Sequence, residues 1–213
     1  AAFLATGAAL RSGCGYVTAM LPQEYIPALA AAYPSALTIG EDADHFDKLP
    51  VNIDKYTSLA IGCGLGQHSH TIRVLEQLLD VYRRPMVIDA DAINIISSNT
   101  ALFGRIPNNS ILTPHIGEFR RLVGQWADER EKIAKARELA ETYSVVVVLK
   151  GAYTMVCLPD GSVWFNSTGN AFMAKAGSGD VLTGLLAGLL ARGYTPADAA
   201  RIGVYYHGLA GEA

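Results

Sequence analysis

Residues 166–184, NSTGNAFMAKAGSGDVLTG, are the stretch around which this chain is organised. An apolar run at 181–190 follows its glycines and predicts a helix. The N-terminus of a helix presents unpaired N–H groups and a partial positive charge, which together favour a bound anion. Glycines at 177 and 179 leave those groups accessible. We therefore predict an anion hole formed by Gly177, Ser178 and Gly179.

Asp180 is the unexpected residue of this stretch, because a carboxylate next to an anion site repels the anion. One interpretation is that Asp180 caps the helix, as aspartates often do at such positions. The other is that it takes a proton from a hydroxyl group that attacks a phosphorus atom. The local sequence leaves both interpretations open.

The composition limits the classes of function. The chain has 213 residues, 50% of them hydrophobic, which is enough for one domain with a sizeable core. Its net charge is −3 and it has no basic run, so neither nucleic acid nor an anionic membrane is an expected partner. There is no apolar span of transmembrane length, and 1–10 lacks the pattern of a signal peptide. Cys14, Cys63 and Cys157 are scattered and predict reduced core thiols in a cytoplasmic protein.

Strand-like and helix-like segments alternate along the chain, without a repeat or a linker. Strands are expected at 16–20, 37–39, 58–62, 85–88, 111–112 and 145–149, and a hairpin at 154–158 and 163–165. Helices are expected at 1–11, 22–32, 67–82, 92–97, 116–122, 128–143, 181–192 and 196–211. This order predicts a single α/β domain over 1–213, with a mostly parallel sheet between two layers of helices and an antiparallel hairpin at one edge.

Polar or glycine-rich clusters follow four of the expected strands, at 62–66, 89–94, 113–118 and 150–154. The carboxyl ends of parallel strands meet at one edge of a sheet, where open α/β sheets bind ligands. The helix that begins after Gly177 can join that edge. Because an acid, an anion-binding turn and a ligand-binding edge rarely coincide by chance, we favour the catalytic interpretation of Asp180.

Other polar residues at this edge have structural alternatives. Asp91 is explained equally well as a cap of the helix at 92–97. His115 follows a proline at a strand-to-helix corner and is expected to point at the ligand-binding edge. Glu118 fits the third position of the helix that follows.

The remaining histidines are not expected to bind a metal. His68 and His70 lie two residues apart at a helix start, so their side chains should diverge and serve as caps or face solvent. Residues 41–44 predict a solvated acidic loop, and His45 next to it is given no role.

A set of motifs, in order along nearly the whole chain, resembles the ribokinase-like ADP- or ATP-dependent (S)-NAD(P)H-hydrate dehydratases, relatives of carbohydrate kinases. The matching segments are ALRSG at 9–13, GCGLG at 62–66, VIDADAIN at 87–94, LTPHIGEF at 112–119, VLKGAYT at 148–154, residues 166–184 and GVYYHGLAG at 203–211. Cys63 and Ile116 stand where the family usually has proline. The family also has a strand before residue 1 and more helix after residue 213, so the resemblance implies a ribokinase-like domain that lacks its first strand and its C-terminal end here.

This resemblance implies the repair of NADH and NADPH whose reduced ring has taken up water at C6. The family removes the water at the expense of ADP, which yields AMP and phosphate, or of ATP, and the prokaryotic character of the chain favours ADP. Asp180 would deprotonate the C6 hydroxyl as it attacks the terminal phosphorus, while the N–H groups of Gly177 to Gly179 stabilise the transferring phosphoryl group. The phosphorylated hydroxyl then leaves readily.

The resemblance also implies a set of binding residues. The nucleotide would contact Lys150, Gly151, Ala152, Tyr153, Thr154 and Gly179. The hydrate would contact Ala1, Gly64, Gly66, His115 and Asp180, with His115 in a neutral hydrogen-bonding role rather than in proton transfer. Further candidates are Asp89, Asp91, Glu118 and Asn170. Lys150 is a candidate phosphate ligand, with a surface lysine at a strand end as the alternative.

Mg²⁺ is expected with the nucleotide, held through water by Asp89 and Asp91. Because the family commonly forms tetramers, a homo-oligomer is expected. The choice between ADP and ATP, the preference for NADH or NADPH hydrate, and a fused epimerase domain upstream stay open.

Three other activities are compatible with parts of the sequence. An ATP-dependent kinase of a small hydroxymethyl heterocycle (a thiazole, pyrimidine or pyridoxal) shares the Gly-Ser-Gly-Asp motif, but 113–115 and 150–154 favour the dehydratase. A non-catalytic adenine-nucleotide sensor would not need Asp180. A nicotinamide dehydrogenase, suggested by the glycines at 62–66, lacks the acidic residue expected to bind the ribose.

Overall fold

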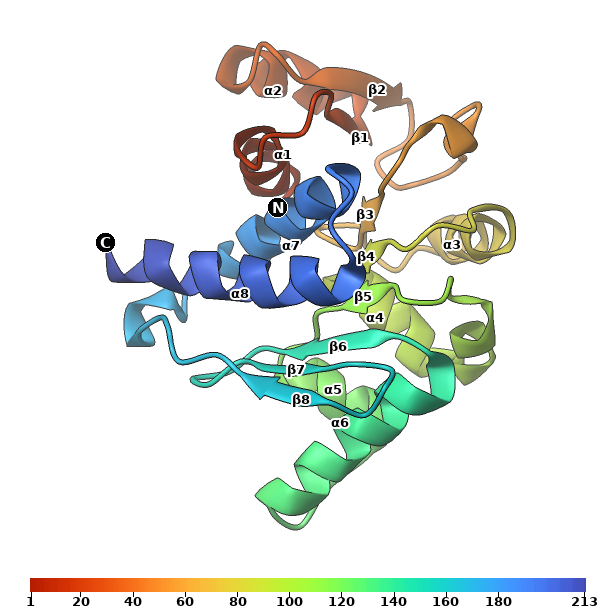
Figure 1. Cartoon of the computed structure of the whole chain (residues 1–213). Helices are drawn as coiled ribbons and strands as arrows, with labels where there is room; N and C mark the ends of the chain where they lie inside the picture. Colours follow the sequence, from red (N-terminus) through yellow and green to blue (C-terminus); the bar gives the residue numbers. More distant parts are fainter.

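Two β-sheets, one of six strands and one of two, organise this protein (Figure 1). The structure is a computed structural model that describes residues 1–213. In the larger sheet the strands lie in sequence order, β3-β4-β5-β6-β7-β8. β3 to β6 pair in parallel, whereas β7 and β8 form an antiparallel hairpin at one edge. The expected α/β class and the hairpin are thereby confirmed.

The strands are short. They are β1 (Thr18–Pro22), β2 (Leu37–Glu41), β3 (Ala60–Ile61), β4 (Val87–Ile88), β5 (Ile111–Leu112), β6 (Val146–Leu149), β7 (Met155–Cys157) and β8 (Val163–Phe165). The α-helices are α1 (Ala2–Arg11), α2 (Ile26–Ala32), α3 (Ser69–Val81), α4 (Ala90–Ser98), α5 (Ile116–Val123), α6 (Glu129–Tyr143), α7 (Ser178–Ala191) and α8 (Pro196–Glu212). Four 3₁₀ helices lie at Gln23–Tyr25, Ile53–Lys55, Thr100–Arg105 and Ala171–Met173. None of the helices has both the length and the apolar character needed to cross a membrane.

The hydrophobic run of β6 is explained by its position between two cores. Val147 and Leu149 face the larger core, which α3 to α6 cover, while Val146 and Val148 face a second core under α7 and α8. Because successive side chains of a strand point to opposite faces, a strand buried on both faces reads as a continuous apolar run. All four side chains are buried.

Two details of the expected fold are wrong. Pro22 ends β1 instead of opening a helix, and α2 starts at Ile26 after a 3₁₀ turn, with a proline in its own first turn. The expected acidic loop at 41–44 is not wholly solvated, because Glu41 belongs to β2, is buried, and accepts a hydrogen bond from the Asp47 N–H at 3.0 Å.

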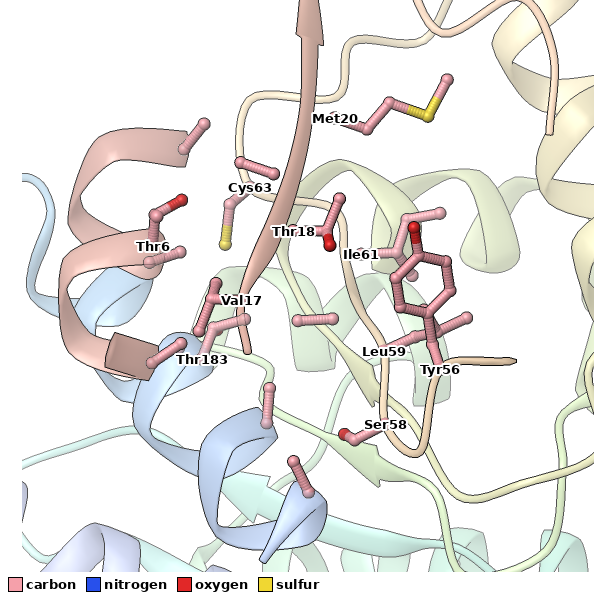
Figure 2. A pocket seen from close by; sticks show the side chains of 18 of the residues that line it. Thr6, Val17, Thr18, Met20, Tyr56, Ser58, Leu59, Ile61, Cys63 and Thr183 are labelled. Carbon is pink, nitrogen blue, oxygen red and sulfur yellow. The ribbon is translucent and has the colours of Figure 1, made fainter. Parts of the chain in front are cut away.

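β1 and β2 form a separate parallel sheet instead of joining the larger one. A cavity of about 280 Å³ lies between β1, β3, α1 and α7, and 21 of its 29 lining residues are hydrophobic. Figure 2 shows Val17 and Thr18 on one side of this cavity, with Thr183 of α7 near Val17, and Ile61 on another side.

α7 packs closely against α1, and glycines make this approach feasible (Figure 1). A Cβ atom at Gly184 would overlap the backbone carbonyl of Ala5, and one at Gly188 would overlap the Ser12 side chain. The two glycines are four residues apart, so they lie on the same face of α7. This packing places the N-terminus of α7 next to the carboxyl ends of β3 and β4.

Candidate active site

The N-terminus of α7 carries the predicted anion hole. Gly177 is the N-cap residue and has a φ of 91°, in the left-handed region that favours glycine. A Cβ atom there would also overlap the Leu4 side chain. At Gly179 a Cβ atom would lie 3.2 Å from Lys150 Nζ, so the lysine ammonium group lies directly over the first turn of α7. The Ser178 N–H, however, already donates to Lys175 O at 3.3 Å, so of the three predicted groups the N–H of Gly177 and of Gly179 are left for an anion. These groups and the lysine cation face the same space.

The Asp180 carboxylate is not engaged in capping, so the capping interpretation is wrong. α7 has no side-chain cap, and Asp180 accepts no hydrogen bond from the protein. Its Oδ2 lies 3.8 Å from the Ala1 nitrogen, and its side chain is 18% exposed. Asp180 thus lies in the first turn of α7 without a hydrogen bond to the helix N–H groups, and the Ala1 nitrogen lies next to it.

Lys150 is held in position by Asp89. Lys150 Nζ donates to Asp89 Oδ1 at 2.7 Å, and Thr183 Oγ1 of α7 donates to Asp89 Oδ2 at 2.8 Å. Burial raises the pKa of the 2% exposed Asp89, but the Lys150 ammonium and the hydrogen bonds from Lys150, Thr183 and Thr113 hold it below its ordinary value. The interpretation of Lys150 as a surface lysine is therefore wrong. β4, β6 and α7 meet at this ion pair.

Asp91 supports the glycine-rich turn at 62–66 instead of capping α4. The N–H of Gly66 donates to Asp91 Oδ2 at 2.8 Å, and the N-cap position of α4 belongs to Asp89. The intervening Ala90 has a φ of 46°, a strained value for a residue with a side chain. This conformation lets two carboxylates so close in sequence serve different partners. In the turn itself, Gly64 lies next to Ala1.

His115 and Glu118 form a reciprocal cap at the start of α5. His115 Nδ1 accepts from the N–H groups of Gly117 (2.9 Å) and Glu118 (3.2 Å), and the His115 N–H donates to Glu118 Oε2 at 2.8 Å. In neutral His115 this leaves the proton on Nε2. The ring is more than half exposed, and Glu118 is buried. Glu118 therefore has a structural role, at the third helical position as expected.

The 150–154 segment adjoins this cap. An isolated parallel bridge joins His115 to Lys150, and the Lys150 N–H donates to Pro114 O at 2.8 Å. Gly151, Ala152 and Tyr153 are exposed in the turn between β6 and β7, and Thr154 Oγ1 donates to Gly151 O at 3.2 Å. The turn is open to a ligand from solvent.

Asn170 shapes the glycine-rich loop before α7. Its Nδ2 donates to Gly211 O at 2.6 Å, and its Oδ1 accepts from the Phe172 N–H at 2.9 Å. Both polar ends of the side chain are thus used within the protein. Asn170 fixes the path of the loop across α8.

Two residues near the site were not foreseen as part of it. Cys63 is no core thiol: its Sγ lies 3.7 Å from Asp89 Oδ2, and Cys63, Asp89 and Asp180 form one cluster with potential ligand atoms within 4.8 Å. Burial, and the carboxylates of Asp89 and Asp180, raise the pKa of the thiol, so Cys63 is a poor nucleophile. The spacing of Cys63 and Asp89 along the sequence does not predict their contact, because the fold of the 62–66 turn brings the thiol to the carboxylate.

His207 of α8 is the other unforeseen residue. Its Nε2 lies 2.9 Å from Ser178 O and 3.3 Å from Ser178 Oγ. Burial lowers the pKa of His207, so the ring is neutral at pH 7 and its Nε2–H donates to the carbonyl. His207 therefore braces the first turn of α7. The family resemblance at 203–211, which includes His207, was the feature of the sequence that could have pointed to this residue.

His45, His68 and His70 form a cluster, so the expected divergence of His68 and His70 is wrong. Their ring centroids are 5.1 Å apart, and the ring of His45 lies 3.9 Å from that of His68. His68 does accept the His70 N–H at 3.3 Å as a cap of α3. The three rings come together because the loop after β2 folds onto the start of α3.

The chemistry of the main site follows from what converges there. A free carboxylate (Asp180), an oriented cation (Lys150) and the helix N-terminus at 177–179 face one space. Such a set can accept a proton from a hydroxyl and stabilise negative charge on a transferring phosphoryl group.

Comparison with known proteins agrees with this arrangement. A curated ADP-dependent (S)-NAD(P)H-hydrate dehydratase from Neisseria meningitidis serogroup B is 37% identical over 98% of this chain and 71% of its own length. A curated bifunctional NAD(P)H-hydrate repair enzyme from Moorella thermoacetica is 38% identical over 98% of this chain. The chain spans only 41% of the length of that relative.

Solved structures support the same relationship. The crystal structure of an ADP/ATP-dependent NAD(P)H-hydrate dehydratase from Bacillus subtilis, co-crystallised with ATP/Mg²⁺ and soaked with CoA, matches with a TM-score of 0.81 at 32% identity. The match covers 98% of this chain and 75% of that one, which confirms the ribokinase-like fold. The whole chain, residues 1–213, also matches the carbohydrate-kinase family described as NAD(P)H-hydrate dehydratase. The chain therefore belongs to the NAD(P)H-hydrate dehydratase family.

Proposed function

We propose that this protein dehydrates the (6S)-hydrates of NADH and NADPH, with ADP or ATP as the phosphoryl donor. One observation carries the proposal beyond family membership. The Asp180 carboxylate accepts no hydrogen bond from the N–H groups of its own helix, and it lies at a helix N-terminus over which Lys150 Nζ is held. A carboxylate that capped the helix would instead accept one of those N–H groups.

In the first step, Asp180 accepts the proton of the C6 hydroxyl as the oxygen attacks the terminal phosphorus of the nucleotide. The bond between that phosphorus and the bridging oxygen breaks, and the nucleotide leaves one phosphate shorter. Negative charge on the transferring group is stabilised by the N–H groups of Gly177 and Gly179, which make no backbone hydrogen bond, and by Lys150. His207 braces Ser178 in this turn.

In the second step, the lone pair of the ring nitrogen expels phosphate from C6, and loss of a proton from C5 restores the reduced ring. Hydroxide itself is a poor leaving group, which explains the need for a nucleotide. Nδ1 of His115 is occupied by the cap of α5, so the exposed Nε2 side of the ring is the part that would hydrogen-bond the hydrate.

The turn at 150–154 supports binding of the nucleotide, and the 62–66 turn with Ala1 supports binding of the hydrate. Magnesium would arrive on the phosphates. Both oxygens of Asp89 already accept hydrogen bonds, so Asp89 suits contact with the ion through water rather than directly. Asp91 has one oxygen that no protein group uses and fits the same role.

ADP is our preferred donor, because the family's bacterial members typically use it. The test is to give purified protein hydrated NADH with ADP or with ATP and to record the return of NADH absorbance. Recovery with either nucleotide supports the proposal, and a faster rate with ADP supports the preference. No recovery, together with phosphorylation of a thiazole, pyrimidine or pyridoxal alcohol, would establish the kinase instead. Nucleotide binding without any turnover would establish a sensor.

We also propose that one further strand completes the fold between β1 and β3. The apolar cavity there and the two strands that face it support this view. Amide hydrogen exchange tests this proposal. The amides of β1 and β3 should exchange more slowly in a polypeptide that includes the family's first strand than in residues 1–213. Equal exchange in the two polypeptides would refute this proposal. A C-terminal extension of α8 stays a prediction.

The assembly of the whole protein is likewise a proposal. Exposed aromatic side chains on β8 and α8 support a homo-oligomer. Because some relatives are named bifunctional, a second repair domain on the same polypeptide stays a prediction, as does a cytoplasmic location.

A further inference from the structure

We propose that His45, His68 and His70 together bind one divalent transition-metal ion of the kind that prefers nitrogen ligands, such as Zn²⁺. The three residues come from two segments, the loop after β2 and the start of α3. One nitrogen of each ring lies within 4.8 Å of a nitrogen of each of the others. None of the three hydrogen-bonds a residue of the phosphoryl-transfer site, so the inference does not depend on the proposed function.

Two of the rings already contact a carboxylate, as the rings of metal-binding histidines usually do. His45 Nδ1 lies 2.9 Å from Asp44 Oδ1, and His70 Nδ1 lies 2.6 Å from Asp47 Oδ1. Ionised carboxylates accept hydrogen bonds, so the ring proton of each histidine sits on Nδ1 and the lone pair on Nε2. A histidine that binds a metal typically donates its other N–H to a carboxylate in this way.

The His45 ring also has a nitrogen without a partner. His45 Nε2 is buried and makes no hydrogen bond within the protein. A buried polar atom without a partner is costly, and such atoms often indicate an ion or water that completes the site. A metal ion at the cluster would satisfy this atom.

His68 must change one contact to take part. Its Nδ1 accepts the His70 N–H at 3.3 Å, which is long for a hydrogen bond and places the ring proton on Nε2. Binding a metal through Nε2 moves that proton to Nδ1 and exchanges the cap for a metal–nitrogen bond. The long distance makes this cap a weak competitor.

Three imidazoles select the class of ion. Imidazole suits zinc, copper, nickel and iron, whereas magnesium and calcium prefer oxygen. Around zinc with bonds of 2.0–2.1 Å, tetrahedral nitrogens lie about 3.4 Å apart, so small ring rotations would bring the cluster to that spacing. Asp47 Oδ1, 3.6 Å from His45 Nε2, adds negative charge beside the ion.

The bound ion would tie the loop after β2 to α3. That loop already bonds α3 at two places, because His70 Nδ1 pairs with Asp47 Oδ1 and Thr71 Oγ1 donates to Phe46 O at 3.1 Å. Phe46, Leu49 and Ile53 of the same segment line the apolar cavity between the sheets. The metal would therefore fix one wall of that cavity, which is a structural role.

The test uses the full chain without a polyhistidine tag, stripped with a chelator and titrated with Zn²⁺ by calorimetry. We expect one site per chain at the cluster and a higher Tm when Zn²⁺ is present. His45→Gln and His70→Gln should each weaken binding by more than about tenfold and abolish the rise in Tm. Asp47→Asn, which keeps all three imidazoles, should weaken binding by about 10–100-fold.

Two variants serve as controls. His115→Gln removes an exposed histidine elsewhere, and Cys63→Ser alters the other cluster of potential ligands; both should bind Zn²⁺ at the cluster as the wild type does. Circular dichroism establishes that each variant is folded. No Zn²⁺ binding, or equal binding by wild type and His45→Gln, means that the rings merely stack and overturns the proposal. Binding that is lost in Cys63→Ser but kept in His70→Gln overturns it as well.

Discussion

At the scale of single residues, Asp180 and Asp89 show how position separates two carboxylates. Asp89 is buried with both oxygens occupied, so it orients Lys150 and cannot take up a proton from a substrate. Asp180 is partly exposed and accepts no hydrogen bond from the protein. The first is built into the structure, and the second is available for chemistry.

We expect Asp180→Asn to retain nucleotide binding and to lose at least about 10²-fold in turnover, the usual contribution of a positioned general base. The amide keeps the shape of the side chain but cannot accept a proton. Single-turnover rates with hydrated NADH and the nucleotide Kd from calorimetry measure the two effects. Turnover equal to that of the wild type would remove the base role from Asp180.

Asp89→Asn should destabilise the protein by about 3 kcal/mol at neutral pH, because it leaves the Lys150 ammonium without its partner at a largely buried site. The pKa of Asp89 in the folded protein lies below its ordinary value of 3.8. The ionised carboxylate therefore stabilises the fold fully above that value, and this stabilisation is lost as the pH falls through the lower, folded pKa.

This prediction is tested by urea unfolding of both proteins at a series of pH values, which gives their free energies of unfolding. The difference in stability between wild type and Asp89→Asn should shrink as the pH falls below about 4. A difference that stays constant over this range would mean that the Asp89 charge contributes nothing to stability.

At the scale of elements, the α1–α7 contact determines where the first turn of α7 lies. Gly184 faces the backbone of Ala5 at a distance that no side chain tolerates. Any residue larger than glycine there must push α7 away from α1, and the first turn of α7 would move with it. The packing of Gly184 on Ala5, about two helical turns from Gly177, therefore affects the geometry at Gly177.

We expect Gly184→Ala to lower the free energy of unfolding by about 1–3 kcal/mol through overpacking, and to weaken nucleotide binding as the helix shifts. Gly104→Ala is the matched control, because a Cβ atom there meets nothing within 4 Å; its effect should stay within about 0.5 kcal/mol. Denaturant unfolding and nucleotide calorimetry give both quantities. Equal stability of the two variants would show that α1 yields to the methyl group.

At the scale of the whole molecule, the edge of the larger sheet is exposed and aromatic. Trp164 and Phe165 of β8 and Tyr205 and Tyr206 of α8 lie at this edge, and all four are exposed. They share one shallow groove along the strand. Exposed aromatic side chains at the edge of a sheet are typical of a surface that a second copy covers.

Phe165→Lys should therefore reduce the molar mass of the protein in solution, because a charge on this surface opposes burial between copies. Phe172→Lys is the control: Phe172 is equally aromatic and 85% exposed but lies outside the groove. Light scattering after size-exclusion chromatography measures both. A wild type with the mass of one chain, or a Phe165→Lys variant with the wild-type mass, would contradict the prediction.

Local patterns determined much of this protein. The order of strands and helices, the hairpin and the glycine-rich turn at 177–179 follow from periodicity and glycine placement, which act over a few residues. The shared edge of the sheet also followed, because parallel strands must bring their carboxyl ends together.

Long-range contacts decided the rest. The Lys150–Asp89 pair, the neighbourhood of Cys63, the brace from His207 and the meeting of His45 with His68 all join residues at least twenty positions apart. Spacing along the chain says nothing about such pairs, since the packing of whole elements sets them. For the same reason, the sequence identified Asp180 as a candidate base, but only the tertiary structure decided that its carboxylate is free and not a cap.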